Sequence, residues 1–505
     1  MFNFATLKKN KRGVITTYVL VFGAIFLILL GGLLGFILLQ LCQSVQKIAW
    51  NQSLQIAEAG INYYRWCLNN EVEESCQTEK DYFDLAGNPI GHFSLETTAQ
   101  EACGKTIQKR IISTGWTNDF PSIKRKISVL YARESVAKFS YILNNNVWIW
   151  SDAEIRGPYH SNGGIRMDGE NQSLVTSAVD KWICTPGAFC LGGCPTANGC
   201  WMEGTDCYCP GVFTTANGDP DLFSSPVPPF DFTGLTVNLA EIKELTYLGG
   251  QGLYFGPSGK EGYYIIFKED RSIDVWTVDS VSTLDNVCTI IGFKIICDNS
   301  TPCELECPKC ESGKCIIHDP GFNPATGSKT FLGNYPIPDC GLVFFEDNLW
   351  VGNESQESKI KGKITVVSAD LINPGEETNV WLQGNINYTV FDGSDGLSII
   401  AQHNNLIGLY SPDQMELRGI FIAQTGYFGR NFYRCPDYSP YCLRSKLEIT
   451  GSVISDGRVG SNWYGGISGY LKRESYFDPN LIYSPPPFVP YVTPEFKIIN
   501  WEEVK

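Results

Sequence analysis

The sequence is short of basic residues for its length. It holds 39 Lys and Arg against 54 Asp and Glu, which gives a formal net charge of −15 at pH 7. A nucleic-acid partner needs cationic surface to bind its phosphates. Four of the cations lie between residues 8 and 12, ahead of a long apolar run, so the rest of the chain is more acidic still. The other basic cluster, at residues 105–126, is interpreted as the solvated face of a small sheet. The composition therefore argues against a nucleic-acid partner.

Recognisable catalytic motifs are missing as well. The four histidines lie in different local contexts, and the chain has no Gly-x-Ser-x-Gly elbow, no His-Glu-x-x-His helix, no P-loop and no Gly-x-Gly-x-x-Gly turn. His160 lies in a glycine-rich turn and is expected to be a structural polar group rather than a base. The segment Asp392–Asp395 has carboxylates suited to calcium, but it is more typical of a tight turn. We therefore expect no enzyme activity, no cofactor and no metal.

The amino-terminal region lacks the features of a secretory signal peptide. The run Val14–Leu41 is apolar and almost uncharged, but it is longer than a signal-peptide core and has no Ala-x-Ala exit. As a helix it extends roughly 42 Å, more than the hydrocarbon core of about 30 Å. Because basic residues precede it, the start is expected in the cytoplasm and the body outside. The sequence thus predicts a single-pass membrane protein with a large extracytoplasmic domain.

The helix is expected to continue beyond the apolar run to about Asn70, because apolar residues recur there at spacings of three and four. Within the run, Gly31 and Gly35 form a Gly-x-x-x-Gly pair, a pattern that lets helices approach closely in lipid and that also arises by chance. Short β-like runs follow between residues 92 and 132. The apolar stripe consists of Leu54, Ala57, Ile61 and Tyr64.

Four features of this region together resemble a known family. They are a basic leader ending in Gly13, the long apolar helix, the segment Ala57-Glu-Ala-Gly-Ile61 and the strand Ile112-Ser-Thr-Gly115. This combination is similar to the PilX-like minor pilins of bacterial type IV pilus systems. The resemblance implies that a prepilin peptidase cuts after Gly13 and leaves Val14 as the first mature residue. A plain single-pass anchor that is never cut is the alternative.

One position departs from the family pattern. Major pilins carry a glutamate as the fifth mature residue, where it neutralises the amino terminus of a neighbouring subunit, and this chain has Tyr18 there. Minor and tip-type pilins often lack that glutamate. The resemblance therefore implies a minor, tip-type subunit in pilus assembly or adhesion. Its expected partners are the membrane, other pilin subunits, and a surface glycan or protein receptor.

From about residue 133 the sequence changes to short strands and turns, with one expected helix at Leu239–Leu245. A four-residue pattern recurs there: a polar residue, a glycine, any residue and an apolar residue. The gaps between its copies suit one solenoid rung, because each rung buries its apolar face only by stacking on its neighbours. An antiparallel β-sandwich fits the same alternation. The recurring glycines are Gly362, Gly384, Gly419 and Gly451, at gaps of 22, 35 and 32 residues. The expected core residues are Ile364, Val366, Ile386, Ile399, Ile400, Phe421, Leu447, Ile449 and Val453.

We therefore predict an α+β protein. A long N-terminal transmembrane pilin-like α-helix and a small β-sheet precede a large all-β, parallel β-helix-like domain with disulfide-rich insertions. The expected boundaries are a basic leader at 1–13, the helix and small sheet at 14–132 with the membrane span at about 14–41, the exported domain at 133–505, and cysteine-rich insertions at about 180–215 and 286–340.

Nineteen cysteines are many for a chain in a reducing compartment. Cys42 lies at the end of the apolar run, and the other eighteen fall in the exported part, an even number that suits disulfides. Cys67, Cys76 and Cys103 are close enough in sequence to staple the helix to the small sheet. The sequence does not assign the pairings. The disulfide candidates are Cys67, Cys76, Cys103, Cys184, Cys190, Cys194, Cys200, Cys207, Cys209, Cys288, Cys297, Cys303, Cys307, Cys310, Cys315, Cys340, Cys435 and Cys442.

The second insertion also has the spacing of a zinc site. A two-residue gap between cysteines lets both thiolates face one ion, and a further cysteine and a histidine follow. The exported location argues against this site, because oxidised cysteines do not bind zinc and nearby cysteines offer pairing partners. Disulfides are therefore favoured over zinc here. The zinc alternative would use Cys307, Cys310, Cys315 and His318.

Three functions fit these observations. A non-enzymatic cell-surface subunit, similar to a minor pilin, is the favoured interpretation. A membrane-anchored β-helix enzyme acting on surface polysaccharide is the main alternative, because many polysaccharide-cleaving enzymes use solenoids. The third is an assembly or priming factor whose outer domain acts only as a spacer. Aromatic clusters such as Trp148 and Trp150 offer stacking surfaces for sugars or protein partners.

Overall fold

The computed structural model describes residues 11–70, 72, 75–185, 189–190, 192–235, 237–285, 287–291, 294–297, 309–311, 314–317, 319–373, 375, 377–463 and 466–504. The chain divides into two compact units. Unit 1 consists of Met1–Ala99, Lys109–Tyr131 and Ile498–Lys505, and unit 2 consists of Gln100–Gln108 and Ala132–Lys497.

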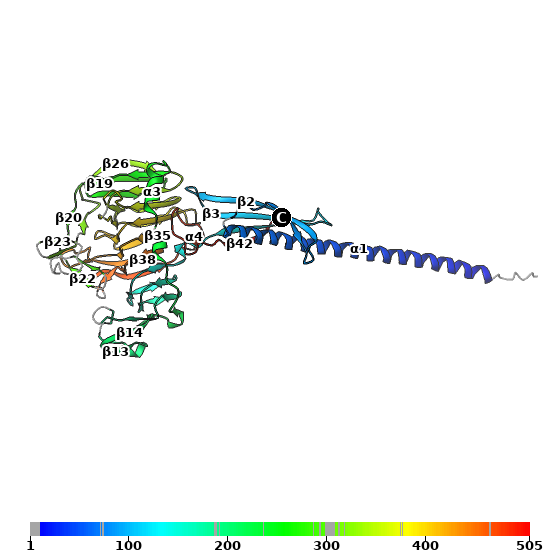
Figure 1. Ribbon diagram of the computed structural model, residues 1–505, viewed down its shortest axis with the longest axis horizontal. Helices are drawn as coiled ribbons and strands as arrows, with labels where there is room; N and C mark the ends of the chain where they lie inside the picture. Colours follow the sequence, from blue (N-terminus) through cyan, green and yellow to red (C-terminus); the bar gives the residue numbers. More distant parts are fainter. Residues whose placement is uncertain are drawn as a thin grey trace, which may run out of the picture. The chain divides into compact units, whose positions relative to one another are not determined.

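Unit 1 combines one long helix with a five-stranded sheet (Figure 1). Helix α1 spans Lys11–Asn69 and contains no proline, so its hydrogen-bond ladder can continue through all 59 residues. The strands lie in the order β1-β2-β3-β4-β42. Their bounds are β1 (Glu79–Phe83), β2 (Pro89–Ala102), β3 (Lys105–Thr117), β4 (Lys124–Ala132) and β42 (Lys497–Val504).

One face of α1 is buried from Ala49 onward. Buried residues recur there every three or four positions, which is the spacing that keeps side chains on one face of a helix. Of the predicted stripe, Leu54 is only half-buried, and Ile56 takes the buried position instead. The buried apolar residues of this face are Ala49, Ile56, Ala57, Ile61, Tyr64, Cys67 and Leu68.

Two glycines allow the helix and the sheet to approach closely. A Cβ atom on Gly60 of α1 would lie 2.4 Å from Ser113 Oγ. A Cβ atom on Gly115 of β3 would lie 2.4 Å from both Ala57 N and Ser53 O in the helix backbone. The helical and strand segments on which the pilin resemblance rests therefore contact each other, and glycine is required on both sides.

Strand β42 returns the end of the chain to unit 1, next to β4. Arg125 Nε donates to Glu503 Oε1 at 2.7 Å, and Arg110 Nη1 lies 3.3 Å from Glu502 Oε1. The last residues were expected in the exported domain that begins at residue 133, whereas the structure pairs Lys497–Val504 in the small sheet. The basic face of that sheet attracts the acidic strand. The larger segment of unit 2, Ala132–Lys497, is therefore inserted in the chain between β4 and β42.

Unit 2 is built from three stacks of parallel strands (Figure 1). Pairings such as β30 with β33 and β33 with β35 are parallel and in register over several residues. These pairings fit the predicted solenoid and exclude an antiparallel sandwich for the described strands of the stacks. The first stack contains, in spatial order, β16 (Phe223–Ser224), β11 (Val175–Ser177), β8 (Tyr159–Ser161), β5 (Tyr141–Leu143), β38 (Leu443–Ser455), β35 (Gln414–Ala423), β33 (Gly396–Ala401), β30 (Lys363–Ser368), β27 (Leu342–Phe345) and β17 (Gly252–Phe255).

The other two stacks complete the rungs. The second stack contains β18 (Gly262–Phe267), β28 (Leu349–Val351), β31 (Val380–Leu382), β34 (Asn405–Ile407), β36 (Phe428–Gly429) and β39 (Val459–Gly460), with a separate group of β6 (Val147–Ile149), β9 (Ile165–Met167) and β15 (Val212–Phe213). The third stack contains β29 (Ser358–Ile360), β32 (Ile386–Tyr388), the first parts of β35 and β38, and then β41 (Ser468–Tyr476), β7 (Ala153–Ile155) and β10 (Glu170–Asn171).

Two of the recurring glycines mark the corner between the third and the first stack. Strands β35 and β38 pass from one stack to the next at Gly419 and Gly451, whose φ angles are +145° and +133°. A Cβ atom on Gly451 would lie 1.9 Å from Gly419 O of the neighbouring rung. The sequence repeat therefore reflects a corner at which successive backbones are too close for a side chain.

The first stack is buried on both faces. Eight of the nine predicted core residues lie in the solenoid interior, and Ile400 lies in a second cluster on the outer face, because successive strand residues point to opposite sides. Burial on both sides explains apolar runs such as Leu342–Phe345. The elements that contribute to this outer cluster are η2 (Val136–Lys138), α2 (Phe232–Leu235), α3 (Leu239–Tyr247) and α4 (Pro479–Tyr483). Helix α3 confirms the helix predicted at Leu239–Leu245.

The rungs are not stacked in sequence order. Val453–Ser455 of β38 pair with Tyr141–Leu143 of β5, and Arg473–Ser475 of β41 pair with Ala153–Ile155 of β7. The first rungs of the chain therefore continue the stack beyond the last ones. The connection from β16 to β17, which carries the proline-rich segment and α3, returns the chain to the opposite end of the first stack.

The remaining strands extend or decorate the solenoid. Strands β19 (Ser272–Val278) and β26 (Lys329–Pro336) add antiparallel strands beside β18. The others are β12 (Lys181–Ile183), β13 (Trp201–Glu203) and β14 (Asp206–Pro210) of the first insertion; β20 (Ser282–Thr283), β21 (Val287–Ile291), β22 (Lys294–Cys297), β23 (Lys309–Glu311), β24 (Lys314–Ile316) and β25 (Pro320–Gly321) of the second; and β37 (Phe432–Tyr433) and β40 (Asn462–Trp463).

Replacing Gly115 by alanine is expected to destabilise unit 1, because the new Cβ would collide with the backbone of α1. Overpacking of this kind costs about 1–3 kcal/mol of unfolding free energy. Hydrogen exchange of peptides from 49–68, measured on the detergent-solubilised chain, should show faster exchange. Gly460→Ala is the matched control, because its Cβ would meet nothing within 4 Å. Equal protection of these peptides in Gly115→Ala and wild type would contradict the packing.

Candidate functional site

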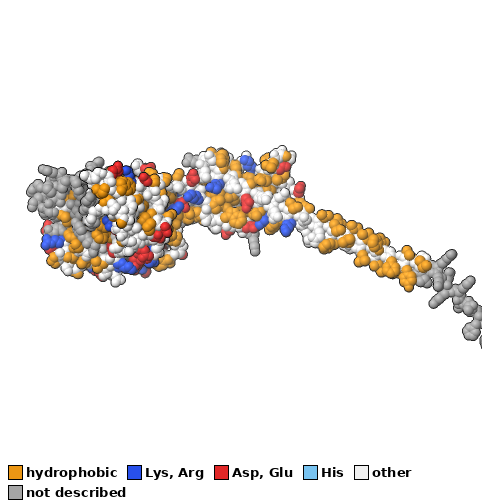
Figure 2. Space-filling model, turned by 90° about the horizontal axis from the view of Figure 1, so that it is seen from below, with side chains coloured by type: hydrophobic (Ala, Val, Ile, Leu, Met, Phe, Trp, Pro, Cys, Tyr) orange, Lys and Arg blue, Asp and Glu red, His pale blue; other side chains and the backbone are white. Residues whose placement is uncertain are grey.

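The first part of α1 presents an apolar surface that the described residues leave uncovered. Every residue from Ile15 to Ile48 is exposed, and Figure 2 shows apolar side chains along this part of the helix. Within the described residues, α1 is the one helix long and apolar enough to cross a membrane, with a mean hydropathy of 2.7 in its most apolar window. A helix that is apolar on all sides is stable in lipid or against similar helices. This segment is the candidate membrane and assembly surface.

The Gly31 and Gly35 pair lies on this exposed segment. A Cβ atom at either position would meet nothing within 4 Å, so no described contact inside the chain requires these glycines. They leave room for the close approach of a second helix. Gly13 and Val14 lie near the start of α1, and their side chains are outside the described residues, so cleavage between them stays a prediction.

The structure pairs fourteen of the candidate cysteines. Cys103 bonds Cys340, which lies 237 residues later, so the expectation that Cys103 staples α1 to the small sheet is wrong. The reason is that residues 100–108, at the turn between β2 and β3, belong to unit 2. Cys42 is free and exposed. Among the described side chains, the seven disulfides are Cys67–Cys76, Cys103–Cys340, Cys184–Cys190, Cys194–Cys207, Cys200–Cys209, Cys288–Cys297 and Cys435–Cys442.

The first insertion is a compact knot of three disulfides. Its cysteines pack with Trp182 and Phe189 in a small core of their own. Some of their sulfur atoms lie within 4.8 Å of one another, but the bonded sulfurs offer no thiolate to a metal. In the second insertion, the side chains of Cys303, Cys307, Cys310 and Cys315, together with His318, lie outside the described residues. The zinc alternative therefore stays an untested prediction.

Peptide mapping without reduction is expected to recover Cys103 linked to Cys340 and Cys67 linked to Cys76. Cys42 serves as the internal control, because it should be alkylated in the denatured chain without prior reduction. Recovery of Cys103 linked to Cys67 or Cys76 would contradict the pairing.

Five glutamates form a row on the outer face of the third stack. They lie opposite one another in successive rungs, in the order Glu416, Glu448, Glu474, Glu154 and Glu170. Like charges directly opposite on neighbouring strands destabilise a sheet. The row therefore needs compensating cations.

Lysines and an arginine supply that compensation. Lys446 Nζ lies 2.8 Å from Glu448 Oε2 and 2.9 Å from Glu474 Oε2. Hydrogen bonds from Lys472 and then from Lys446 lower the pKa of Glu474 to about 2. Arg156 Nε donates to Glu154 Oε1 at 2.6 Å. The centre of the row is thus a set of ion pairs rather than a free acidic surface.

Glu474→Gln should destabilise unit 2 in a pH-dependent way. The folded-state pKa lies below the ordinary value of 4.5, so the carboxylate's contribution is present above about pH 4.5 and is lost as the pH falls towards 2. The difference in urea midpoint between wild type and variant should shrink over that interval. Glu416→Gln, at the exposed end of the row, is the control and should shift the midpoint little. A pH-independent difference for Glu474→Gln would rule out the ion-pair origin.

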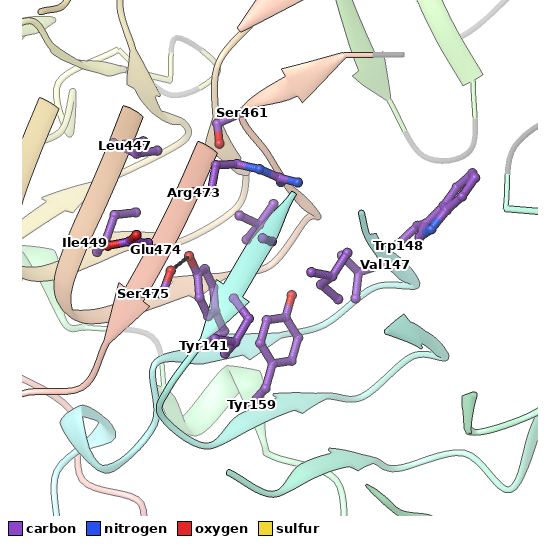
Figure 3. Close-up of a pocket in the computed structure, with 14 residues that line it drawn as sticks. Tyr141, Val147, Trp148, Tyr159, Leu447, Ile449, Ser461, Arg473, Glu474 and Ser475 are labelled. Carbon is purple, nitrogen blue, oxygen red and sulfur yellow. Dashed lines mark hydrogen bonds between the residues drawn. The ribbon is translucent and has the colours of Figure 1, made fainter. Parts of the chain in front are cut away.

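The first rungs of the chain and the last ones meet around a small cavity of about 30 Å³ (Figure 3). Tyr141 and Tyr159 line it from β5 and β8, and the Tyr141 hydroxyl shares a hydrogen bond of 2.7 Å with Ser475 Oγ. Next to them, Arg473 donates two hydrogen bonds to Asp152, at 2.8 and 2.9 Å. Burial raises the pKa of both tyrosines. The volume suits about one water molecule, so this site is a joint between rungs rather than a substrate pocket.

The acidic turn considered for calcium is held by its own backbone. Asp392 Oδ1 accepts from Ser394 N at 2.9 Å and Ser394 Oγ at 2.6 Å. Asp395 accepts from Gly362 N at 2.6 Å, and its other oxygen accepts from Thr389 Oγ1 and Val390 N. These bonds occupy the carboxylates in the way of a tight turn.

The histidines have separate structural partners. His160 is buried, with Nδ1 2.9 Å from Thr176 Oγ1 and Nε2 3.1 Å from Asn162 Oδ1, and burial lowers its pKa. His92 lies 2.7 Å from Asp81, and His403 lies beside Glu377.

The shifted carboxyl pKa values among the described residues all change in the same direction. Wherever the pKa of such a carboxyl is shifted, it is shifted down. A general acid for glycoside hydrolysis needs a raised pKa.

Sequence reasoning missed the joint between the rungs. Tyr141 and Ser475 come from opposite ends of the domain, and no motif relates them.

The geometry defines a class of protein: an apolar stalk helix with a small sheet that carries an inserted β-solenoid. No protein-family model matches the chain, and no curated protein matches it. Among solved structures, the chain is similar to the competence-associated pilin ComZ from Thermus thermophilus, with a TM-score of 0.29 and 13% sequence identity over 90% of this chain and 98% of that chain. A similarity this low carries no argument about fold or function, which must come from the chain's own residues.

Proposed function

We propose that this chain is a non-enzymatic, minor pilin-like subunit of a type IV pilus system that displays its β-solenoid outside the cell, in assembly or adhesion. The observation that carries the proposal is the division of α1 into two parts. Residues 49–68 are held by the chain's own sheet, and residues 15–48 expose apolar side chains on every face. Such a helix suits lipid before assembly and similar helices after it. The membrane and other pilin subunits are therefore the proposed partners.

The residue at the fifth mature position supports a low-copy role. Tyr18 is 60% exposed on α1, and a neutral phenol does not neutralise the amino terminus of a neighbouring subunit as a glutamate does. A subunit at the tip needs no such contact with a following copy of itself. The minor, tip-type assignment rests on this difference together with the resemblance.

The enzyme alternative receives less support from the described residues. Neither the joint cavity nor the glutamate row supports sugar cleavage, because the cavity is too small for a sugar and the centre of the row is occupied by ion pairs. A display role needs none of these groups to react. The solenoid is therefore proposed as a structural and binding domain.

Amino-terminal sequencing tests the proposal. In cells with a functional prepilin peptidase, the protein extracted from the membrane is expected to start at Val14. Gly13→Val should retain Met1, because the resemblance to the family implies that the peptidase cuts after the leader glycine. Gly23→Val, a glycine of the same helix with nothing within 4 Å of its Cβ, is the control and should be cut normally.

An intact Met1 in the wild-type protein from such cells would show a simple anchor instead of a pilin-type subunit. Turnover of a surface polysaccharide by the purified wild-type chain would favour the enzyme. Loss of pili in a deletion strain, restored by a chain in which unit 2 is replaced by an unrelated exported domain, would favour the spacer role.

A further inference from the structure

A second cavity, of about 200 Å³, opens on the outside of unit 2 at the corner between the third and the first stack. Three successive rungs contribute to it, through Tyr388 of β32, Arg418 of β35 and Thr450 of β38. The turn after β32 and the segment Phe477–Asn480 complete the wall. If a water molecule occupies about 30 Å³ of liquid, the cavity has room for roughly six or seven waters, the size of one sugar ring.

The wall of this corner pocket combines aromatic rings with convergent polar groups. Phe391 and Phe477 line it, and the Arg418 guanidinium lies 5.0 Å from the centre of the Phe391 ring. Arg418 Nε donates to Asn387 Oδ1 at 2.6 Å, and the guanidinium has further N–H donors. Asp478 accepts from Asn480 N at 3.0 Å through one carboxylate oxygen. Donors, acceptors and apolar faces therefore meet in one small space.

One hydroxyl in the wall lacks a partner. Tyr388 is 4% exposed, and its hydroxyl makes no hydrogen bond with the described residues. Burial raises the pKa of this hydroxyl. A backbone group of Leu397 lowers the pKa to a smaller extent, although it does not reach hydrogen-bond geometry. The charges that act on the hydroxyl are those of Asp478, Arg418 and Asp395, which also line the pocket. A buried polar group without a partner is costly, so a ligand that bonds this hydroxyl would gain from it.

The corner pocket carries charges of both signs. Arg418 lines it together with Asp478 and Asp395, and both carboxylate oxygens of Asp395 are already bonded by the turn. Arg418 and Asp478 are therefore the charged groups left to a ligand, and their opposite charges favour neither an anion nor a cation. A neutral polyhydroxylated ring can use both signs of charge through its hydroxyls and can place its apolar face on a phenylalanine.

We propose that the corner pocket binds a single neutral hexose residue, such as the terminal sugar of a surface glycan. Arg418 and Asp478 bond adjacent hydroxyls, the Tyr388 hydroxyl bonds a third, and Phe391 packs on the ring face. This proposal adds a ligand to the proposed display role. It rests on that role only because unit 2 must lie outside the cell to reach a surface glycan. Cleavage at Gly13 has no part in it.

Ligand-observed NMR on the full chain tests the pocket directly. The probes are methyl glycosides of glucose, galactose, mannose and N-acetylglucosamine, with the protein in a detergent that has no sugar head group. At least one probe should bind the wild type. Arg418→Ala should weaken binding of that probe at least tenfold, or about 1.4 kcal/mol. Absence of binding by all four probes would overturn the proposal.

Tyr388→Phe separates binding from folding. Its hydroxyl has no protein partner, so the urea midpoint of unfolding should stay the same or rise, while hexose affinity falls about tenfold. Tyr141→Phe is the matched control, because that equally buried hydroxyl bonds Ser475 and lies in the joint cavity. It should lower the midpoint and leave hexose affinity unchanged. Unchanged hexose affinity in Tyr388→Phe, or a fall in both its affinity and its midpoint, would overturn the assignment of the hydroxyl.

These results are independent of pilin processing. An uncut chain that binds a hexose through Tyr388 supports the pocket even where the pilin proposal fails. A correctly processed chain that binds none of the probes leaves the pilin proposal standing and removes the pocket.

Discussion

The pairing of β38 with β5 is the contact on which unit 2 depends. It joins residues more than 300 positions apart in the chain, and it turns two separate runs of rungs into one stack. Each rung buries its apolar side chains only against its neighbours, so either run alone would leave an open strand edge and an uncovered core. Closing such a long loop costs conformational entropy, and this cost arises before the contacts of the pairing are made. The joint between Tyr141, Ser475, Arg473 and Asp152 secures this same interface.

Unit 1 has the same dependence on the end of the chain. Its sheet is complete only when β42 lies beside β4, and the acidic Glu502 and Glu503 then meet the basic strands. Neither unit can therefore be finished while the last part of the chain is still being synthesised. The stalk helix is different, because α1 needs only local hydrogen bonds. The helix and the two β-structures therefore differ in how much of the chain must be present before they can form.

Local features of the sequence predicted the fold well. The apolar run predicted α1, the helical spacing predicted its buried face at Ala57, Ile61 and Tyr64, and the repeated glycines predicted successive rungs, although not the corners that the structure shows at Gly419 and Gly451. What the sequence did not predict was long-range pairing. The Cys103–Cys340 bond, the return of β42 to the small sheet and the permuted order of rungs each join segments that carry no mutual signal. The corner pocket was missed for the same reason, since Tyr388 and Arg418 come from two different rungs and Asp478 comes from the segment after the last rung.

The position of unit 2 between two neighbouring strands has a topological consequence. Because β4 and β42 are adjacent in one sheet, a short hairpin loop could replace the whole body and leave a small, closed stalk protein. In topology, the body is thus an insertion into one connection of the small sheet. Residues 100–108, at the turn between β2 and β3, also belong to this body, and the Cys103–Cys340 disulfide holds that turn to the inserted segment.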